Sequence, residues 1–300
     1  MPVDLLDRVV TRLGLTERPA ADLPGLRTLY RAWCDRVPFD NVRKLISLGA
    51  GDARPFPGGR ADDFLEAWLA HGAGGTCWPS SNALHAVLTS LGFDARRVAG
   101  SMRDMGVVNH GSIKVWLEGR DWLVDSSMLT TEPLPLGDVP FFLDDPVFVA
   151  EVEPVGDSHV VWLDLPPNSE YLPCRLLEDP VDHEYYLSAY ERSRGFSPFN
   201  QRLFARRNLP NQLFVLFGRT RFVKTPAGLS RTDLSRNGLR EALAGEIGLS
   251  GPLIDEWTRA GGLDAAFEPP AGPPPPPNTR QPPSRRRPRS ASEPRPVREP

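Results

Sequence analysis

The chain has 300 residues, of which 40% are hydrophobic and 24% are charged, a composition that provides enough apolar material for a folded core. No apolar run approaches the ~18–20 residues of a membrane span, and the charged, amphipathic start does not resemble a signal peptide. Three cysteines, Cys34, Cys77 and Cys174, are too few and too far apart for a disulfide framework, so reduced thiols in the cytoplasm are expected.

Charge and proline are unevenly distributed. Residues 268–300 hold 13 of the 33 prolines, together with seven Arg and three Glu, whereas the body of the chain has a net charge of about −7. A body of this sign does not suit nucleic acid, which binds clustered Lys and Arg. Residues 268–300 have no apolar periodicity and are predicted to be a disordered tail. The histidines show no metal-ligand spacing, so no metal site is expected.

Helical periodicity dominates the first 92 residues. Apolar residues at helical spacing predict helices within residues 1–50, at 61–71 and at 82–91, and Gly92 is suited to end the last of these. One of these helices is expected to end ahead of Pro38, because the residue before a proline disfavours the helical conformation.

The apolar period then changes from about 3.6 to two. This alternation predicts strands at 95–100, 110–117, 121–125, 147–152 and 159–164, with Glu118-Gly119 as the tip of a hairpin. Helices are expected again at 183–192 and 235–248, with short strands at 213–217 and 222–224 between them. The predicted order is therefore helical, then β, then mixed.

Cys77 has the setting of a nucleophile. It follows Gly74-Gly75-Thr76 and stands at the expected start of a helix, where the partial positive charge favours a thiolate. The glycines permit a close approach to the sulfur. With a two-residue turn at Glu118-Gly119, His110 lies opposite Ser127, and Asp125 is its diagonal neighbour on the same face of the sheet. A Cys–His–Asp arrangement is geometrically possible, but spacing alone favours a buried cysteine beside an ordinary hairpin.

The chain resembles the arylamine N-acetyltransferase family in several short segments that occur in the same order. Arg36–Asn41 (RVPFDN) is similar to the family's R-I-P-F-E-N, and Gly74–Trp78 (GGTCW) is similar to R-G-G-x-C-F. The helix from Leu84 to Phe93, the segment Asn109-His110 with Trp122–Asp125, and Ser197-Pro198-Phe199 also match family segments.

The resemblance implies an α+β fold of three parts, with a cysteine-proteinase-like arrangement. These parts are a helical bundle (1–92) carrying the nucleophile, a β-barrel (93–194) carrying His and Asp, and an α/β lid (195–267), followed by the tail (268–300). It also implies an N-acyltransferase in which Cys77 accepts an acyl group from a thioester, most simply acetyl-CoA, and passes it to an amine. His110 and Asp125 complete the catalytic triad, Phe39, Trp78 and Phe199 contribute to substrate binding, and no permanently bound cofactor is expected.

The chain departs from the family pattern beside the nucleophile and after Asp125. Ala73 and Pro79 stand where the family has a charged pair, Ser81 stands where it has an Asn, and Ser126–Leu129 replaces a glycine-containing turn near the acyl-donor site. This last change leaves open a second interpretation, an amide synthase that takes its acyl group from a carrier protein. A cysteine hydrolase of the papain or transglutaminase type and a non-catalytic binding module are further alternatives.

Overall fold

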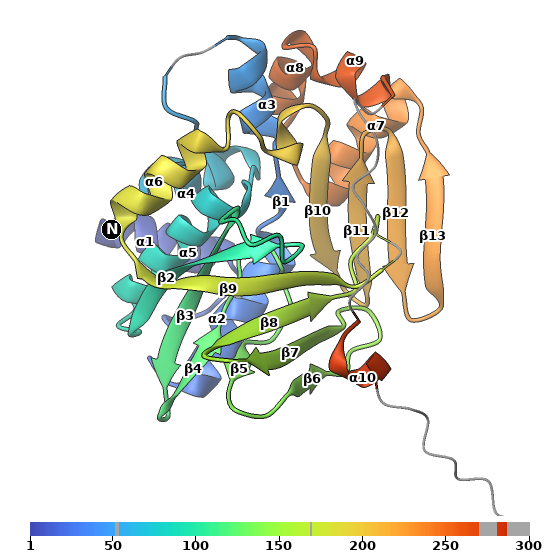
Figure 1. The fold of residues 1–300 in the computed structure, drawn as a ribbon. Coiled ribbons are helices and arrows are strands. Elements are labelled where there is room, and N and C mark those ends of the chain that lie inside the picture. The colour runs from blue at the N-terminus through green and yellow to red at the C-terminus, as the bar shows by residue number, and fades with distance from the viewer. Residues whose placement is uncertain (52–53, 169, 270–280, 287–300) are drawn as a thin grey trace, which may run out of the picture.

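The computed structural model describes residues 1–51, 54–168, 170–269 and 281–286, and its ribbon is drawn in Figure 1. The helical elements are α1 (Val3–Arg12), α2 (Leu23–Arg36), α3 (Val42–Gly49), α4 (Ala61–His71), α5 (Cys77–Ser90), α6 (His183–Arg192), a 3₁₀ turn (Pro198–Asn200), α7 (Arg236–Ala242), a π-helical turn (Leu243–Ile247), α8 (Gly251–Arg259), α9 (Gly262–Phe267) and α10 (Pro283–Arg286).

The strands are β1 (Phe39–Asp40), β2 (Ala95–Met102), β3 (His110–Leu117), β4 (Arg120–Leu123), β5 (Leu134–Leu136), β6 (Phe141–Leu143), β7 (Ala150–Val155), β8 (Ser158–Leu163), β9 (Leu172–Val181), β10 (Phe204–Leu209), β11 (Gln212–Phe217), β12 (Thr220–Thr225) and β13 (Gly228–Asp233).

Local sequence signals explain the limits of the first helices. The Asp22 side chain accepts a hydrogen bond from the backbone N–H of Gly25 (2.8 Å) and so caps the start of α2. That helix ends ahead of Pro38, as expected from the sequence. Helix α4 ends at Gly72, whose left-handed conformation (φ 68°) favours glycine. The helix that contains the predicted segment 82–91 begins at Cys77, at the start expected from the sequence, and Pro79 is tolerated in its first turn.

The helical part shares its core with the start of the first sheet. Buried apolar side chains of α1, α2, α4 and α5 pack with side chains of β3 and β4, and Trp33, Trp68, Leu84 and Ile113 are among the members of this cluster. Helix α5 therefore lies directly against the hairpin that carries His110. This packing brings the predicted nucleophile and the predicted base close together.

The middle of the chain forms an antiparallel eight-stranded sheet in the order β5-β4-β3-β2-β9-β8-β7-β6. The two ends of this order, β5 and β6, also contact each other, so the sheet curls into a barrel-like shape (Figure 1). The fold class expected from the sequence, an α+β fold with helical, barrel-like and mixed parts, is confirmed. The strands β5, β6 and β9 are not among those predicted.

A second antiparallel sheet has five strands in the order β1-β10-β11-β12-β13. Strand β1 comes from the helical part of the sequence and pairs with β10, with Phe39 opposite Arg206. Helices α3, α7, α8 and α9 pack with β10 and β11 around Trp257. The helix predicted at 235–248 is divided into α7 and the π-helical turn, which ends at Gly248.

Part of the predicted disordered tail is described and part is not. Residues 270–280 and 287–300 lie outside the described residues. Between them, α10 (Pro283–Arg286) is a helical turn, and the backbone N–H of Ser284 donates to the Glu151 carboxylate on β7 (3.1 Å). This contact differs from the expectation of a tail without structure.

Candidate active site

Cys77 is the first residue of α5, and the chain leading to it is tightly enclosed. A side chain at Gly74 would collide with the carbonyl oxygen of Pro38, because an added Cβ would lie 1.7 Å from it. The Gly74 N–H donates to the Asp40 carboxylate (2.7 Å), which fixes this approach. The glycine is therefore required by a neighbouring segment of the same chain, and it places Cys77 at the positive end of a helix.

The hairpin that carries His110 has the predicted two-residue turn. Glu118 and Gly119 both have positive φ (53° and 75°), as a type I′ turn requires. Leu117 pairs with Arg120 in this register. The His110 Nε2 atom and the Asp125 Oδ2 atom are 2.7 Å apart, and both side chains are buried. The predicted contact between His110 and Asp125 is confirmed.

Burial and charge act in opposite directions on this pair. Burial disfavours the charged imidazole, but the Asp125 carboxylate outweighs it and raises the pKa of His110 well above its usual value. Burial likewise opposes the Asp125 carboxylate, yet the charge and hydrogen bond of His110 lower its pKa to about 2. The pair is therefore an imidazolium beside a carboxylate.

Asp125 is held by its own loop and by α2. Its Oδ1 atom accepts hydrogen bonds from the backbone N–H groups of Ser127 (2.8 Å) and Met128 (2.7 Å). The Tyr30 hydroxyl donates to the Asp125 carbonyl (2.8 Å) and accepts from the Asp125 N–H (3.2 Å). These contacts leave Oδ2 directed at His110.

Cys77 lies beside His110. Its Sγ atom is 4.0 Å from the carbonyl oxygen of Asn109, and a hydrogen bond with Cys77 contributes to the raised pKa of His110. The two other thiols, Cys34 and Cys174, are fully buried, and burial raises the pKa of each to about 12. The fold therefore brings together the three residues that the sequence singled out.

The predicted substrate-binding residues fall into two groups. Phe39 and Phe199 contact each other edge to face, with ring centroids 5.1 Å apart, and the backbone of Phe39 bridges to Gly75, two residues before Cys77. Trp78 is in the same apolar cluster as Cys77 but packs edge to face on Tyr186 (4.9 Å). Phe39 and Phe199 thus form one aromatic wall, and Trp78 lies apart from it.

The departures from the family pattern are accommodated by apolar packing and by new hydrogen bonds. Ala73 is fully buried in an apolar cluster, and Pro79 is also buried. The Ser81 hydroxyl donates to the Gly111 carbonyl (2.9 Å) and contacts the Ser126 hydroxyl (2.9 Å). Two of the unusual residues, Ser81 and Ser126, are therefore direct partners that tie α5 to the loop after Asp125.

Several residues around the site were not found from the sequence. Arg206 and Asn208 of β10 donate to the backbone carbonyls of Met128 and Leu129, and so fasten the loop after Asp125. Lys44 of α3 is buried in contact with Phe56. These residues are far from Cys77 in sequence, and no local pattern distinguishes them.

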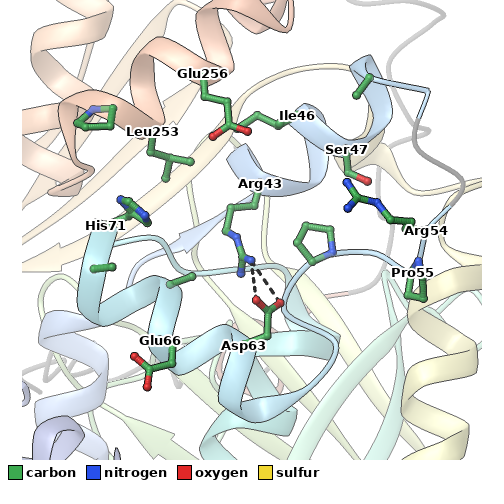
Figure 2. A pocket seen from close by; sticks show the side chains of 15 residues that line it. Arg43, Ile46, Ser47, Arg54, Pro55, Asp63, Glu66, His71, Leu253 and Glu256 are labelled. Carbon is green, nitrogen blue, oxygen red and sulfur yellow. Dashed lines mark hydrogen bonds and ion pairs between the residues drawn. The ribbon is translucent and has the colours of Figure 1, made fainter.

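A cavity of about 770 Å³ lies elsewhere, between α3, α4 and α8 (Figure 2). Its lining includes the ion pair of Arg43 and Asp63 (3.0 Å), together with His71 and Glu256. Cys77, His110 and Asp125 do not line it. We therefore place the candidate active site at the buried cysteine and not at this cavity.

Comparison with known proteins agrees with this fold. Residues 22–139 match a family model described as N-acetyltransferase. The structure of arylamine N-acetyltransferase from M. smegmatis aligns with a TM-score of 0.73 and 22% identity, covering 85% of this chain and 97% of that one. A Mycobacterium marinum arylamine N-acetyltransferase in complex with CoA aligns with a TM-score of 0.73 and 19% identity, covering 87% of this chain and 97% of that one. The chain has the arylamine N-acetyltransferase fold.

Curated relatives match over a shorter segment. The proansamycin X synthase of Amycolatopsis mediterranei is 29% identical over 125 residues, covering 40% of this chain and 46% of the relative. The arylamine N-acetyltransferase of Mycolicibacterium smegmatis is 27% identical over 125 residues, covering 39% of this chain and 43% of the relative. The chain thus spans less than half the length of the curated relatives it matches. The resemblance drawn from the sequence motifs is confirmed.

Among the described residues, no helix is both long and apolar enough to cross a membrane. No group of three or more His, Cys, Asp or Glu side chains in that part of the chain is arranged to hold a metal ion.

Proposed function

We propose that the protein is an N-acyltransferase that moves an acyl group, most simply acetyl from acetyl-CoA, to a primary arylamine through an acyl-cysteine on Cys77. The observation that carries this proposal is the buried His110–Asp125 pair (2.7 Å) beside a cysteine at the first position of a helix. The fold shared with arylamine N-acetyltransferases, one of them solved in complex with CoA, supports it.

In the first half-reaction, the charged His110 favours the thiolate form of Cys77. The thiolate attacks the thioester carbonyl, the carbon–sulfur bond to CoA breaks, and His110 gives its proton to the departing CoA thiolate. The products are an acyl-cysteine and free CoA thiol. Backbone N–H groups in the first turn of α5 lack carbonyl partners within the helix and can stabilise the oxyanion.

In the second half-reaction, the amine nitrogen attacks the acyl-cysteine carbonyl. His110 accepts a proton from the amine, the bond to Cys77 breaks, and the amide is released together with the restored thiolate. Asp125 holds the imidazole in the required orientation and stabilises its charged form. In this proposal Phe39 and Phe199 border the acceptor amine, and Trp78 supports the segment that carries Cys77.

A second candidate function is an amide synthase that receives its acyl group from a carrier protein. The loop after Asp125 favours it, because Arg206 and Asn208 hold the Met128 and Leu129 carbonyls where the family has a glycine-containing turn. The match to proansamycin X synthase is also consistent with this candidate. The two candidates share Cys77, His110 and Asp125 and differ in the acyl donor.

Intact-mass measurement after mixing with acetyl-CoA tests the proposal. We expect an added mass of about 42 Da that maps to Cys77 and disappears when an arylamine is added, as in a two-step covalent mechanism. The Cys77→Ala variant, which should fold normally, is the control and should remain unmodified.

The acyl donor decides between the two candidates. Transfer from a carrier-bound acyl thioester, without transfer from acetyl-CoA, would favour the amide synthase. Modification of neither kind, or release of the acyl group only to water, would contradict both. Activity retained by Cys77→Ser at a substantial level would exclude a covalent thiol mechanism.

A further inference from the structure

Lys44 is a buried cation near the candidate nucleophile. Its side chain belongs to α3 and is 3% exposed. The Nζ atom donates to the Ser193 hydroxyl (2.8 Å) and lies over the rings of Phe56 (4.9 Å) and Tyr190 (5.7 Å). Aromatic faces of this kind stabilise a cation, so the site is adapted to hold a positive charge.

Among the described residues, Lys44 has no carboxylate partner, whereas each of the other lysines has one. The chain has three lysines. Lys114 is paired with Asp179 (2.7 Å), and Lys224 is paired with Asp164 (3.0 Å). For Lys44, the described residues offer no carboxylate oxygen within ion-pairing distance. An ammonium has three N–H donors, and burying its charge without a counter-ion is costly. One hydrogen bond to Ser193 leaves this capacity largely unused.

The surroundings of Lys44 connect it to Cys77. One buried apolar cluster contains Phe56, Tyr190 and Cys77. Lys44 contacts the first two of these, Phe56 and Tyr190. The nearest carboxylate in sequence to Ser193, Glu191, accepts from the Phe56 N–H (2.6 Å) and pairs with Arg194.

Charges around Lys44 affect its protonation. The pKa of Lys44 is lowered to about 8, chiefly by burial; Cys77 and Glu191 oppose this shift, and the charge of Arg194 adds to it. The guanidinium of Arg194 also lies over the Phe56 ring, 3.8 Å from the ring centroid. The surroundings of Cys77 therefore include two positively charged side chains over aromatic rings.

We propose that the Lys44 ammonium binds a carboxylate of the substrate that reacts at Cys77. This inference rests on the proposed function and deepens it by naming the substrate class: an aryl or acyl compound with a carboxylate on the side of the molecule away from the reacting atom. The carboxylate belongs either to the acceptor amine or to the acyl group. Lys44 acts as a specificity-determining residue, since it contacts the substrate but not the reacting atoms.

Binding to a protein that cannot turn over separates this inference from catalysis. In a Cys77→Ala background, calorimetry measures the Kd of benzoate and of benzamide, which have the same ring and differ in charge. Adding Lys44→Met should raise the Kd of benzoate by about 10- to 100-fold, the range for losing a hydrogen bond to a charged group, and leave that of benzamide unchanged. Lys224→Met is the matched control and should change neither.

A pH series provides a second reading that does not need the Lys44 variant to fold. In the Cys77→Ala protein, benzoate affinity should fall as the pH rises through about 8, where Lys44 loses its charge, and benzamide affinity should stay level. Of the groups facing Lys44, Cys77 is absent from this protein, and burial raises the pKa of Tyr190. The carboxylate of Glu191 and the guanidinium of Arg194 also act on Lys44, and both are present throughout the series.

Turnover then identifies which substrate carries the carboxylate. One arm compares 4-aminobenzoate with 4-aminobenzamide as acceptors of acetyl from acetyl-CoA, and the other compares succinyl-CoA with butyryl-CoA as donors to aniline. Lys44→Met should raise KM for the charged member of one arm only. Equal losses for benzoate and benzamide, or benzoate affinity that is independent of both Lys44 and pH, would overturn the inference while leaving the proposed acyl transfer intact.

Discussion

The electrostatic interaction between His110 and Asp125 lies where water has little access. The two side chains are 3% and 1% exposed, so the field of each acts on the other with little screening. The raised pKa of His110 and the pKa of about 2 for Asp125 are two expressions of the same interaction. Their effect on stability therefore depends on pH in a defined window.

Asp125→Asn should remove this stabilisation and most of the activity. The pair stabilises the fold above the unfolded pKa of Asp, about 4, and below the unfolded pKa of His, about 6.5. The contribution is lost as the pH falls through about 2 and as it rises through the raised pKa of His110. The Tm difference between wild type and variant should thus be largest at about pH 4–6.5.

Kinetics and titration complete the test of Asp125→Asn. The rate of acyl transfer should fall on the order of 10⁴-fold, because Asn selects the wrong tautomer and cannot support the imidazolium. The pKa of His110, followed by NMR, should fall in the variant. A Tm difference that is constant with pH, or a His110 titration that does not move, would show that the two groups are not coupled.

At the residue scale, the sequence was most informative where geometry is local. The pairing of His110 with Asp125 follows from one two-residue turn, because a turn at Glu118-Gly119 sets the register of the whole hairpin. Lys44 could not be found this way. Its burial depends on α6 and on the segment around Phe56, and long-range packing of that kind leaves no mark at the lysine itself.

At the scale of elements, strand β1 and the residue after it join three segments near Cys77. Asp40 accepts hydrogen bonds from the N–H groups of Val42 (3.0 Å) and Gly74 (2.7 Å). The Asn41 amide donates to the carbonyls of Phe199 (2.9 Å) and Arg202 (2.7 Å). The short motif that includes Asp40 and Asn41 is therefore a structural junction.

Asp40 should make stability depend on pH in the direction opposite to that of Asp125. Burial raises the pKa of Asp40 to about 6, so its protonated form is favoured in the fold. Its contribution is greatest below about pH 4, the unfolded pKa, and is lost as the pH rises through about 6. Relative to Asp40→Asn, which does not titrate, wild type should lose about 2–3 kcal/mol between pH 4 and pH 7.

Denaturant unfolding of both proteins across this pH range measures the difference. Asn41→Ala is a suitable control, because it removes neighbouring hydrogen bonds without removing a titrating group. Its cost should be the same at each pH. The opposite outcome would be a free energy of unfolding that rises for wild type, relative to Asp40→Asn, between pH 4 and 7. It would mean that the N–H partners stabilise the Asp40 carboxylate by more than burial destabilises it.

Elements were predictable where their apolar pattern was regular. Helix α4 (Ala61–His71) and strand β3 (His110–Leu117) coincide with the predicted ranges. Strand β9 (Leu172–Val181) was missed because its second half is exposed and it contains two prolines and Asp179. Strand β13 (Gly228–Asp233) is exposed along its length at the edge of its sheet, so it has no buried face to produce an alternating pattern.

At the scale of the whole molecule, the sequence parts are interleaved in space. Strand β1 from the helical part completes the five-stranded sheet, and β10 reaches back to the loop after Asp125 through Arg206 and Asn208. The order of the three parts can be predicted from the change in apolar period. The contacts between the parts cannot be predicted in this way, because polar side chains that bind distant carbonyls have no periodicity.

A further hydrogen-bonded contact between distant segments joins β7 to the proline- and arginine-rich tail. Glu151 of β7 is 3% exposed, and it accepts hydrogen bonds from both the backbone N–H and the hydroxyl of Ser284. Sequence composition predicts that the tail can be removed without effect on stability. The contact predicts otherwise, because truncation after Phe267 leaves a buried carboxylate without these donors.

We expect this truncation to lower the Tm by a few degrees, since losing partners of a buried polar group costs about 1–3 kcal/mol. Acyl transfer should be unchanged, because β7 is not adjacent to β3 in the curled sheet: β2, β9 and β8 lie between them on one side, and β4 and β5 on the other. In the full-length chain, Ser284→Ala removes only the hydroxyl donor and should give a smaller decrease. A truncated protein with unchanged Tm would show that water replaces Ser284 at Glu151, and a loss of turnover at temperatures well below the Tm would show that the tail acts at the site itself.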